Sequence, residues 1–357
     1  MTIAITGATG FLGLRLVSLL LERGEQVVVL ARTGTAPSLP RILRYLEGSS
    51  VTPDTARARM TVLSADVGRP RLGLPERQFR ALAEHVTEIW HSAAATTLDE
   101  STTLVRRTNV DGTRHVLELA AAGTARLCHV STAFVAGRRS AGVVREDDLD
   151  PSYGFENPYE ESKYLAEVAV HEWSARHGRP VTIFRPSVLV TVRPPRPGDV
   201  PHTLTTLTTL AGYALGGLTE RARVRVAADP HAHLNLMPVD LAARLMVDTA
   251  ATAAPAGVRT VHVTHPREVG QATLFSLFEK LFPLRLEQVS TTPEDLTEQE
   301  AVVAQHMRVV MPYAFHRRYY DRTALRAAGL DPADAVPLGL DDLLAGLGRP
   351  IKAGARP

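Results

Sequence analysis

Three glycines, Gly7, Gly10 and Gly13, follow the short apolar run Ile3–Ile5. A glycine-rich turn between a strand and a helix lets the chain bend sharply, lets backbone approach a pyrophosphate, and lets the helix pack close to the strand. The N–H groups that open the following helix, near Phe11, would then face the phosphates, where the helix dipole favours anions. A second apolar run follows this helix. We therefore predict a dinucleotide-binding turn here rather than a flexible loop.

Beyond this motif, short β-rich runs alternate with helix-length amphipathic stretches up to about residue 186. The predicted strands are 2–6, 26–31, 59–65, 87–91, 125–131 and 180–185, and the predicted helices between them are 11–23, 38–47, 76–85, 100–122 and 157–177. Such alternation is expected when crossover helices cover both faces of a parallel sheet. The sequence thus predicts an α/β fold, a Rossmann-type doubly wound parallel sheet with a smaller C-terminal substrate lobe.

The alternation ends at a proline-rich stretch near residue 195, which can continue neither a helix nor a strand. We expect residues 1–190 to form the dinucleotide-binding domain. Residues 235–264 would return to that domain as a strand, a helix and a further strand. Residues 191–234 and 265–350 would then form the substrate-binding lobe.

Charge and cysteine content argue against several other classes of protein. The 357 residues include 40 Lys and Arg against 38 Asp and Glu, a balance that does not favour nucleic acid or an anionic membrane as a partner. The single cysteine, Cys128, cannot form an internal disulfide, which suits a cytoplasmic location. We find no signal peptide and no apolar run of the roughly 18 residues that a membrane span needs. His231 and His233 are only two positions apart and have no cysteine nearby, so no metal site is expected.

Two residues of the predicted helix 157–177 could carry acid–base chemistry. Tyr159 and Lys163 are four positions apart, so both would lie on one helix face and point into one cleft. Because an ammonium group stabilises a phenolate, we expect Lys163 to lower the pKa of Tyr159 from about 10 toward neutrality. The pair would then serve as a proton donor or acceptor, rather than as a surface stack of the two side chains.

A further candidate follows the predicted strand 125–131. Ligands of an open α/β sheet bind beyond the carboxyl ends of its strands, so Thr132 would donate a second hydrogen bond to an oxygen that gains negative charge. The alternative is a hydroxyl that stabilises a turn. Ser131 would point to the other face, and Cys128 is expected to be a small core residue rather than a nucleophile. We expect Asn109 to brace the sheet near the site, with a proton-relay role as the alternative.

Together, the glycine turn, the hydroxyl after the fifth strand and the Tyr-x-x-x-Lys helix resemble the extended short-chain dehydrogenase/reductases. The resemblance narrows to the thioester reductase and fatty acyl-CoA reductase branch, which includes reductase domains of carboxylic acid reductases and nonribosomal peptide synthetases. The stretches that carry it are Asp66-Val67, Leu72-Gly73-Leu74, His91-Ser92-Ala93-Ala94, Asn109-Val110-Asp111-Gly112-Thr113, Val130-Ser131-Thr132-Ala133-Phe134-Val135, Tyr159-Glu160-Glu161-Ser162-Lys163 and Met237-Pro238-Val239-Asp240. Members of this branch release a thioester-bound acyl group as an aldehyde or alcohol.

The chain departs from the branch after Arg185-Pro186-Ser187, where members continue toward a glycine-containing turn. Here residues 188–192 run directly into prolines. No carrier-protein or adenylation domain accompanies these residues, so we expect the acyl donor to come from elsewhere. Both departures bear on the substrate more than on the hydride chemistry.

An arginine at the end of the second strand indicates NADPH. An NAD site typically holds the ribose 2′-hydroxyl with an acidic residue, whereas an arginine accommodates a 2′-phosphate. That position is Arg32, and the resemblance assigns the same phosphate to Arg41. Asp66 would either reach the adenine, as the resemblance implies, or cap its own loop. The residues expected to contact NADPH are Gly7, Thr9, Gly10, Phe11, Leu12, Gly13, Arg32, Arg41, Asp66, Val67, Ala93, Ala94, Tyr159, Lys163 and Pro186.

These residues favour an NADPH-dependent reductase of a biosynthetic pathway, acting on an acyl thioester of CoA or of a carrier protein. Thr132 and Tyr159 would hold the thioester carbonyl, and the resemblance implies that Lys163 holds the nicotinamide ribose. Reduction of a free aldehyde, ketone or other polarised double bond on a small metabolite remains open. A nucleotide-sugar epimerase or dehydratase fits less well because Arg32 favours NADPH. A non-catalytic dinucleotide-binding protein would not need the acid–base pair.

Two stretches of the expected substrate lobe allow two interpretations each. The Thr/Leu stretch 203–218 predicts an amphipathic helix that either covers the sheet edge or closes over the substrate as an apolar lid. The basic and aromatic stretch 313–322 predicts either a solvated helix face or a docking surface for an acidic carrier protein or the phosphates of CoA. In both cases the first interpretation is favoured.

Overall fold

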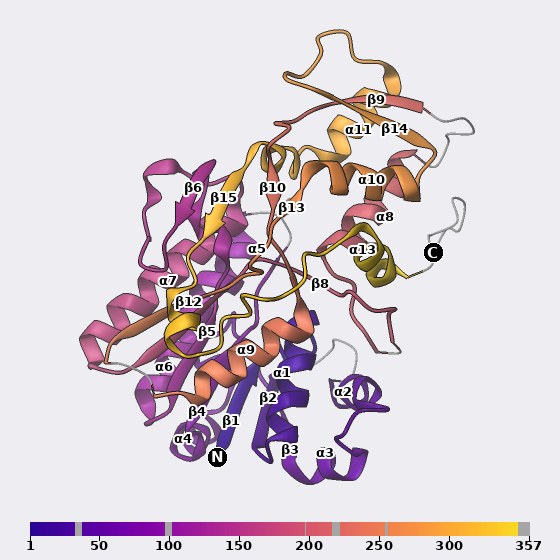
Figure 1. Ribbon diagram of the computed structural model, residues 1–357. Coiled ribbons are helices and arrows are strands. Elements are labelled where there is room, and N and C mark those ends of the chain that lie inside the picture. Colours follow the sequence, from indigo (N-terminus) through magenta and orange to yellow (C-terminus); the bar gives the residue numbers. More distant parts are fainter. Residues whose placement is uncertain (33–37, 97–101, 197, 216–221, 254–255, 349–357) are drawn as a thin grey trace.

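One parallel sheet organises the molecule (Figure 1). The computed structural model describes residues 1–32, 38–96, 102–196, 198–215, 222–253 and 256–348. Within them, seven strands lie in the order β12-β7-β5-β4-β1-β2-β3. Their bounds are β1 (Thr2–Thr6), β2 (Gln26–Ala31), β3 (Met60–Ser64), β4 (Glu88–His91), β5 (Arg126–Val130), β7 (Val181–Pro186) and β12 (Val258–Val263). The order reverses between β1 and β4, which is where doubly wound folds bind ligands.

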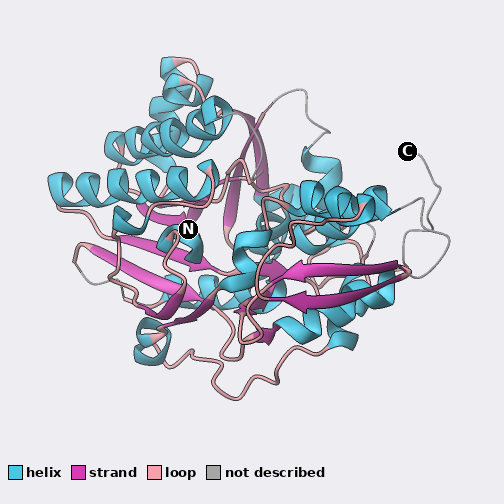
Figure 2. Ribbon diagram, turned by 90° about the horizontal axis from the view of Figure 1, so that it is seen from above, coloured by secondary structure: helices cyan, strands magenta, loops and turns pink. Residues whose placement is uncertain are grey.

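Helices cover both faces of this sheet, as Figure 2 shows from above. One layer contains α1 (Phe11–Glu22), α2 (Ser38–Leu46), α3 (Pro53–Arg59), α9 (Val239–Ala251) and α12 (Thr323–Ala327), and the other contains α4 (Glu76–His85), α6 (Gly112–Ala122) and α7 (Pro158–His177). Ile3 and Ile5 of β1 enter the first core, and Ala4 between them enters the second. Because both faces of the sheet are buried, neighbouring residues of β1 are apolar on both faces. The predicted Rossmann-type sheet is confirmed.

The helix expected at 100–122 is divided into consecutive segments. These are α5 (Thr102–Arg106), η2 (Arg107–Asp111) and α6, and the first two residues of the expected helix lie outside the described residues. The short helices η1 (Pro70–Gly73) and η4 (Pro151–Tyr153) lie in the connections that follow β3 and β6.

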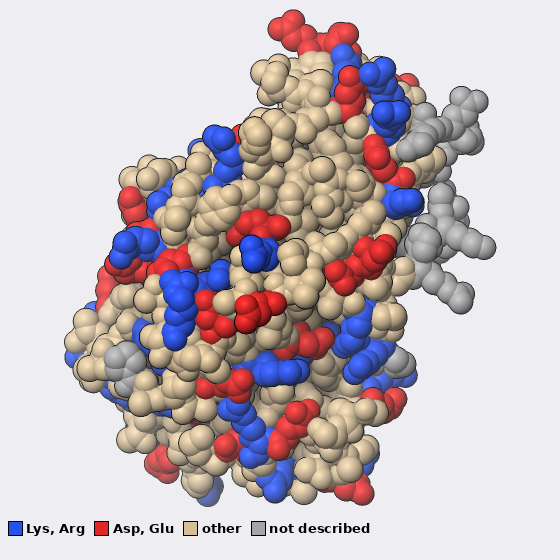
Figure 3. All heavy atoms as spheres, in the orientation of Figure 1, with Lys and Arg blue, Asp and Glu red and all other residues tan. Residues whose placement is uncertain are grey.

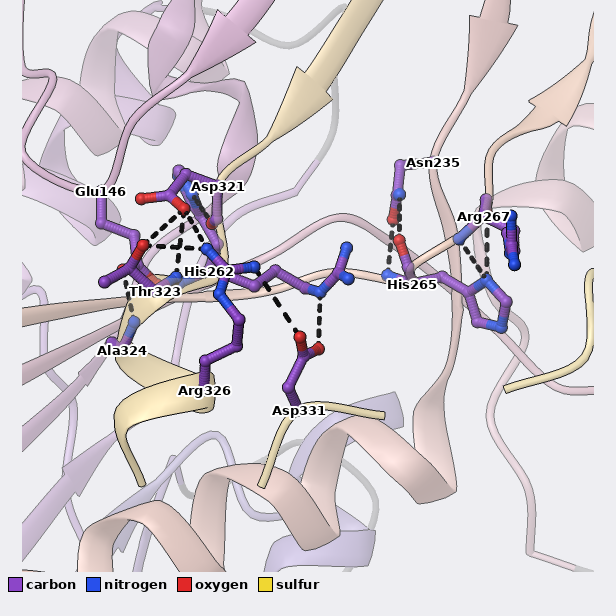
Figure 4. Close-up of polar contacts among 11 residues, drawn as sticks. Glu146, Asn235, His262, His265, Arg267, Asp321, Thr323, Ala324, Arg326 and Asp331 are labelled. Carbon is purple, nitrogen blue, oxygen red and sulfur yellow. Dashed lines mark hydrogen bonds and ion pairs between the residues drawn. The ribbon is translucent and has the colours of Figure 1, made fainter. Parts of the chain in front are cut away.

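The outer edge of the sheet, at β12, is covered by polar contacts (Figure 4). The half-buried carboxylate of Glu146 accepts hydrogen bonds from the backbone N–H groups of His262 at 2.9 Å and of Ala324 at 2.8 Å. Nδ1 of His262 lies 2.8 Å from the carbonyl oxygen of Asp321. An open strand edge can pair with another chain, so these contacts and helix α12 protect it.

The remaining elements form a smaller lobe beyond the carboxyl ends of the strands (Figure 1). Its described elements are α8 (Thr203–Leu215), β9 (Ala222–Ala227), β10 (His233–Leu234), β13 (Val269–Gly270), α10 (Gln271–Leu281), β14 (Leu284–Val289), α11 (Glu298–Met307), η5 (Met311–Phe315), β15 (Arg317–Tyr320) and α13 (Leu340–Leu347). The short strands β8 (Val188–Val190) and β11 (Leu236–Pro238) lie where the lobe joins the sheet domain, and they contribute residues to the cores of both. Short two-stranded ladders join β8 to β11, β9 to β14 and β10 to β13. The strand β6 (Ala141–Val144) pairs with β15 and so connects this lobe to the sheet domain. The domain limits drawn from the sequence stay a prediction.

Two expectations for this lobe need correction. The helix expected at 203–218 is present as α8, but it packs against β8 and α11 within the lobe instead of covering the sheet edge. Residues 216–218 lie outside the described residues. The stretch 313–322 is not a solvated helix face: it contains η5 and the strand β15, and His316 and Arg318 are buried.

Charges of both signs are interspersed on the face that Figure 3 displays. Among the described residues, no helix is long and apolar enough to cross a membrane. The described part of the chain also contains no group of three or more His, Cys, Asp and Glu side chains placed to hold a metal ion.

Candidate active site

The turn between β1 and α1 brings backbone segments closer together than side chains would allow. Gly7 has a φ of 71°, and a Cβ atom there would lie 2.6 Å from the backbone nitrogen of Ala93. A Cβ on Gly13 would lie 2.0 Å from the carbonyl oxygen of Gly7. Two of the three glycines are therefore required by close packing of this turn.

The N-terminus of α1 suits an anion. Gly10 is its N-cap, no side chain caps the helix, and no acidic residue lies in its first turn. The first-turn N–H groups, at Phe11 and the next residues, are therefore free to bind phosphate oxygens, which the helix dipole also favours. Leu12 is buried in the core beneath the turn, whereas Thr9 and Phe11 are partly exposed beside it.

A buried hydrogen-bond chain fixes the neighbouring loop against the glycine turn. Oγ1 of Thr6 accepts hydrogen bonds from the backbone N–H groups of Ser92 and Ala93, at 3.2 and 3.1 Å. Nδ1 of His91 lies 2.8 Å from the same hydroxyl, and its Nε2 lies 3.1 Å from Oγ1 of Thr113. Burial, with a further contribution from the charge of Lys163, lowers the pKa of His91 to about 3. A neutral His91 therefore links β1, β4 and α6.

Asn109 connects this loop to α7. It lies in the π-helical turn η2, and such turns are frequent at functional sites. Its amide donates to the carbonyl oxygen of Ala95 at 3.0 Å and to Oγ of Ser162 at 2.8 Å, and its Oδ1 accepts from the N–H of Ala95 at 2.8 Å. These contacts match the expected bracing role, and the proton-relay alternative stays a prediction.

Thr132 lies directly beyond the carboxyl end of β5, where it opens the short helix η3 (Ala133–Ala136). Its Oγ1 accepts a hydrogen bond from the N–H of Phe134 at 3.3 Å and lies 3.5 Å from the carbonyl oxygen of Pro186, at the end of β7. The hydroxyl also hydrogen-bonds to Tyr159. Thr132 thus stabilises a turn and contacts the phenol, while its role as a second donor to an oxygen that gains negative charge stays a prediction.

The pKa of Tyr159 differs from the expectation. Burial raises this pKa to about 12, the hydrogen bond from Thr132 lowers it in part, and the charge of Glu160 raises it further. The expected lowering toward neutrality by Lys163 is therefore wrong. The physical reason is that loss of solvent around the hydroxyl disfavours the phenolate more than its neighbours stabilise it. Tyr159 is accordingly a neutral hydrogen-bond donor at physiological pH.

Lys163 is buried one helical turn further along α7. Its Nζ donates to the carbonyl oxygen of Val130 at 2.7 Å. Burial lowers the pKa of Lys163 to about 8, although the charge of Glu167 acts in the opposite direction. The ammonium is held at the end of β5, beside the turn that contains Thr132. The structure therefore brings Thr132, Tyr159 and Lys163 to one place.

The other residues expected to contact the cofactor lie around the same edge of the sheet. Arg32 follows the carboxyl end of β2, and Arg41 lies on α2; both side chains are exposed. Asp66 follows β3 and accepts a hydrogen bond from the N–H of Gly68 at 3.0 Å, so it caps its own loop. Val67 contacts α6 through its carbonyl oxygen, which lies 2.7 Å from Nδ1 of His115.

The segment around the proline-rich stretch lies against α1, the helix that follows the glycine turn. The sequence did not indicate this contact. The buried Arg15 of α1 forms ion pairs with Asp199 at 2.8 Å and with Asp240 at 3.2 Å. Its guanidinium carbon lies 4.6 Å from the centre of the Phe11 ring, and the centre of the His202 ring lies 5.3 Å from that of Phe11. The connection into the lobe is therefore fixed next to the N-terminus of α1.

Sequence reasoning missed several residues that shape the site. The stretches that carry the resemblance include His91 and Thr113, and Thr6 directly precedes the glycine turn. The sequence indicates these positions but not the hydrogen bonds that join them. Ser162 had a signal, because it lies within the Tyr-x-x-x-Lys motif. Tyr313, which reaches Glu160 of α7 from 153 residues further along the chain, had no local signal for this contact.

The geometry can be compared with known proteins. A family model described as "Male sterility protein" matches residues 5–246, more than half of the chain. The chain belongs to the male sterility protein family. A stretch of 187 residues, 51% of this chain, is 36% identical to isonitrile lipopeptide synthase of Streptomyces coeruleorubidus, of which it covers 13%. One of the subunits of linear gramicidin synthase from Brevibacillus parabrevis is 30% identical over 255 residues, 70% of this chain and 5% of that protein.

A solved structure extends the similarity of this male sterility family member to nearly its whole length. The terminal R domain from the myxalamid PKS-NRPS biosynthetic pathway has a TM-score of 0.76 and 27% identity, covering 97% of this chain and 89% of that one. The chain thus spans a small part of its curated relatives but most of an R domain. The resemblance to the extended short-chain dehydrogenase/reductases, in the thioester reductase branch, is confirmed. So are the class, an NAD(P)-dependent oxidoreductase, and the use of a nicotinamide cofactor.

Proposed function

We propose that this chain is an NADPH-dependent reductase of acyl thioesters that releases the acyl group as an aldehyde or alcohol. The observation that carries the proposal is the meeting of Thr132, Tyr159 and Lys163 where β5 ends and α7 begins. Such a cluster of hydrogen-bond donors suits a carbonyl oxygen that gains negative charge.

Several residues fit NADPH. The close backbone approach at Gly7 and the uncapped start of α1 suit a pyrophosphate. The exposed side chains of Arg32 and Arg41 carry the charge that a 2′-phosphate requires, and neither position is acidic. The ammonium of Lys163 has three N–H groups, so its bond to Val130 leaves donors for ribose hydroxyls. When bound, NADPH supplies the hydride that reduces the carbonyl carbon.

The protein residues would act on the carbonyl oxygen. Thr132 and Tyr159 would donate hydrogen bonds to that oxygen, which stabilises the negative charge formed when hydride reaches the carbon. Because the pKa of Tyr159 is raised to about 12, the phenol is protonated at neutral pH and can pass its proton to the oxyanion. Collapse of the resulting hemithioacetal breaks the C–S bond, and the products are an aldehyde and a free thiol.

The relatives favour a thioester over a free carbonyl compound. The similar proteins are named as a lipopeptide synthase and part of a gramicidin synthase, and the similar structure is an R domain of a PKS-NRPS pathway. In this chain we propose a substrate delivered as a thioester of CoA or of a carrier protein. Residues 191–234 and 265–350 would form the lobe that receives it, next to the NADPH domain of residues 1–190 and 235–264.

Thiol release tests the proposal. The protein is mixed with NADPH and an acyl-CoA, and free thiol is measured with a chromogenic reagent while NADPH oxidation is followed by absorbance. We expect one thiol for each NADPH if the aldehyde is released, and one thiol for every two NADPH if an alcohol is released. If acyl-CoA gives no thiol and NADPH is oxidised only when a free carbonyl compound is added, the protein is instead a reductase of free carbonyl compounds.

A further inference from the structure

Tyr313, in η5 of the C-terminal lobe, reaches the first turn of α7 through its hydroxyl. The hydroxyl donates a hydrogen bond to Oε1 of Glu160 at 2.6 Å and accepts one from Nδ2 of Asn157 at 2.8 Å. Glu160 is the chain neighbour of Tyr159, and Asn157 is the N-cap of the helix that carries Tyr159 and Lys163. Tyr313 thus forms hydrogen bonds with residues on both sides of Tyr159, the proposed proton donor.

These three side chains close a ring of hydrogen bonds. Oδ1 of Asn157 accepts from the N–H of Glu160 at 3.1 Å, which completes the ring through Tyr313. The second oxygen of Glu160 accepts from the N–H of Glu156 at 2.9 Å. Asn157 and Glu160 are both buried, so water competes little with these bonds. The ring therefore fixes the backbone on either side of Tyr159.

The aromatic ring of Tyr313 contacts the second donor's turn as well. It packs edge-on against Phe134, with ring centres 5.2 Å apart and planes at 88°. The N–H of Phe134 donates to Oγ1 of Thr132, and the guanidinium carbon of Arg318 lies 5.3 Å from the centre of the Phe134 ring. Tyr313 thus contacts Phe134, which hydrogen-bonds to Thr132, and it also hydrogen-bonds to Asn157 and Glu160 on either side of Tyr159.

We propose that Tyr313 is a positioning residue that holds Thr132 and Tyr159 in the relative placement needed for one carbonyl oxygen to bind both. The inference rests on the proposed function, because it assigns a role in that reaction to a residue that does not touch the substrate. Small displacements of donors from a reacting oxygen lower the rate strongly while leaving distant contacts unchanged. The glycine turn and the two arginines, which would bind NADPH, lie on other elements, and Lys163 of α7 is held separately by its hydrogen bond to Val130.

Replacement of Tyr313 by Phe tests this role, because it removes the hydroxyl and keeps the ring. We expect kcat for thioester reduction to fall about tenfold, with the Kd for NADPH, measured by fluorescence, changed by less than about twofold. Tyr319→Phe is the matched control: Tyr319 lies on the adjoining strand, is half exposed and contacts the ring of His233. The control should retain the kcat of the unmodified protein.

A second variant keeps the proposal testable if Tyr313→Phe fails to fold. Asn157→Ser retains an oxygen for the N–H of Glu160, and serine is a good N-cap, but it has no amide to donate to Tyr313. We expect kcat to fall about threefold in this variant at unchanged NADPH affinity. Unchanged kcat in both variants, beside an active unmodified protein, would overturn the positioning role. An unmodified protein that reduces no thioester would instead refute the proposed function.

Discussion

The hydroxyl of Thr132, at the end of β5, hydrogen-bonds to the phenol of Tyr159 in the first turn of α7. These residues are far apart in the chain, and the contact exists because β5 ends and α7 begins at the carboxyl edge of the sheet. It gives the site two adjacent neutral donors. A carbonyl oxygen placed between them would accept both hydrogen bonds, which is the arrangement that stabilises an oxyanion.

Removal of the phenol hydroxyl should abolish most activity. In Tyr159→Phe we expect kcat to fall by about 10² or more, because the proton donor to the oxyanion is lost, with NADPH affinity nearly unchanged. Tyr164→Phe is a suitable control, since Tyr164 lies on the same helix and packs against Phe155. Steady-state kinetics and a fluorescence titration measure the two effects. Full activity of Tyr159→Phe would remove this residue from the mechanism.

The decrease of kcat/KM at high pH should reflect the loss of a proton from Lys163. Its pKa is lowered to about 8 by burial, so the ammonium loses its proton as the pH rises through that value. Because the charged form is the one proposed to bind ribose hydroxyls, we expect kcat/KM to decrease above about pH 8. Lys163→Arg should move this decrease to higher pH, since a guanidinium stays charged. Lys280→Arg, an exposed site on α10, should leave the decrease in place, and a shift there would contradict the assignment.

The proposed preference for NADPH should depend on two arginines. We expect Arg32→Ala and Arg41→Ala each to weaken NADPH binding about tenfold and to change NADH binding by less than about twofold, because only NADPH carries the 2′-phosphate. Arg57→Ala, at an exposed position of α3 paired with Asp54, serves as the control. Titrations of both cofactors at one salt concentration provide the comparison. Equal losses for NADH and NADPH would show that these side chains do not read the phosphate.

Buried histidines should make the fold sensitive to acid. Burial lowers the pKa of His91 and of His262 to about 3 and holds the pKa of His129 well below its usual range. Below about pH 6.5 the unfolded chain binds protons that the folded chain does not, so the free energy of unfolding falls by roughly 1.4 kcal/mol per histidine for each pH unit. Urea unfolding at pH 7.5 and 5.5 measures this loss.

His129 can test whether buried histidines cause this loss of stability, because neither of its ring nitrogens has a hydrogen-bond partner among the described residues. His129→Leu should reduce the loss of stability between pH 7.5 and 5.5 by about one histidine's share, whereas His85→Gln, at an exposed site, should not. An unchanged pH dependence in His129→Leu would contradict the explanation.

The sheet was predictable because its strands and helices follow one another in sequence with clear changes in periodicity. The predicted strand 2–6 coincides with β1, and strand 26–31 with β2. Helix α3 was missed although Thr52 and Pro53 form a helix start, because the segment is only seven residues long. In the lobe, the strand β15 was mistaken for a helix, since its partner β6 lies far away in the sequence and periodicity carries no information on such pairing.

For the candidate site, the residues could be named from the sequence but their electrostatics could not. Tyr159 and Lys163 share a helix face as their spacing requires, yet the pKa of Tyr159 shifts upward because burial depends on neighbours from other elements. The ring of hydrogen bonds through Tyr313 is similarly tertiary. Local pattern thus indicates which groups meet, while the packing of distant segments decides their protonation.

The most direct measurement of the central claim is NADPH oxidation, followed by absorbance, with a panel of acyl-CoA thioesters beside the matching free aldehydes and ketones. The account predicts turnover with thioesters, and loss of that turnover in Tyr159→Phe. Turnover with the aldehydes or ketones alone would contradict thioester reduction and assign the same residues to the reduction of free carbonyl compounds.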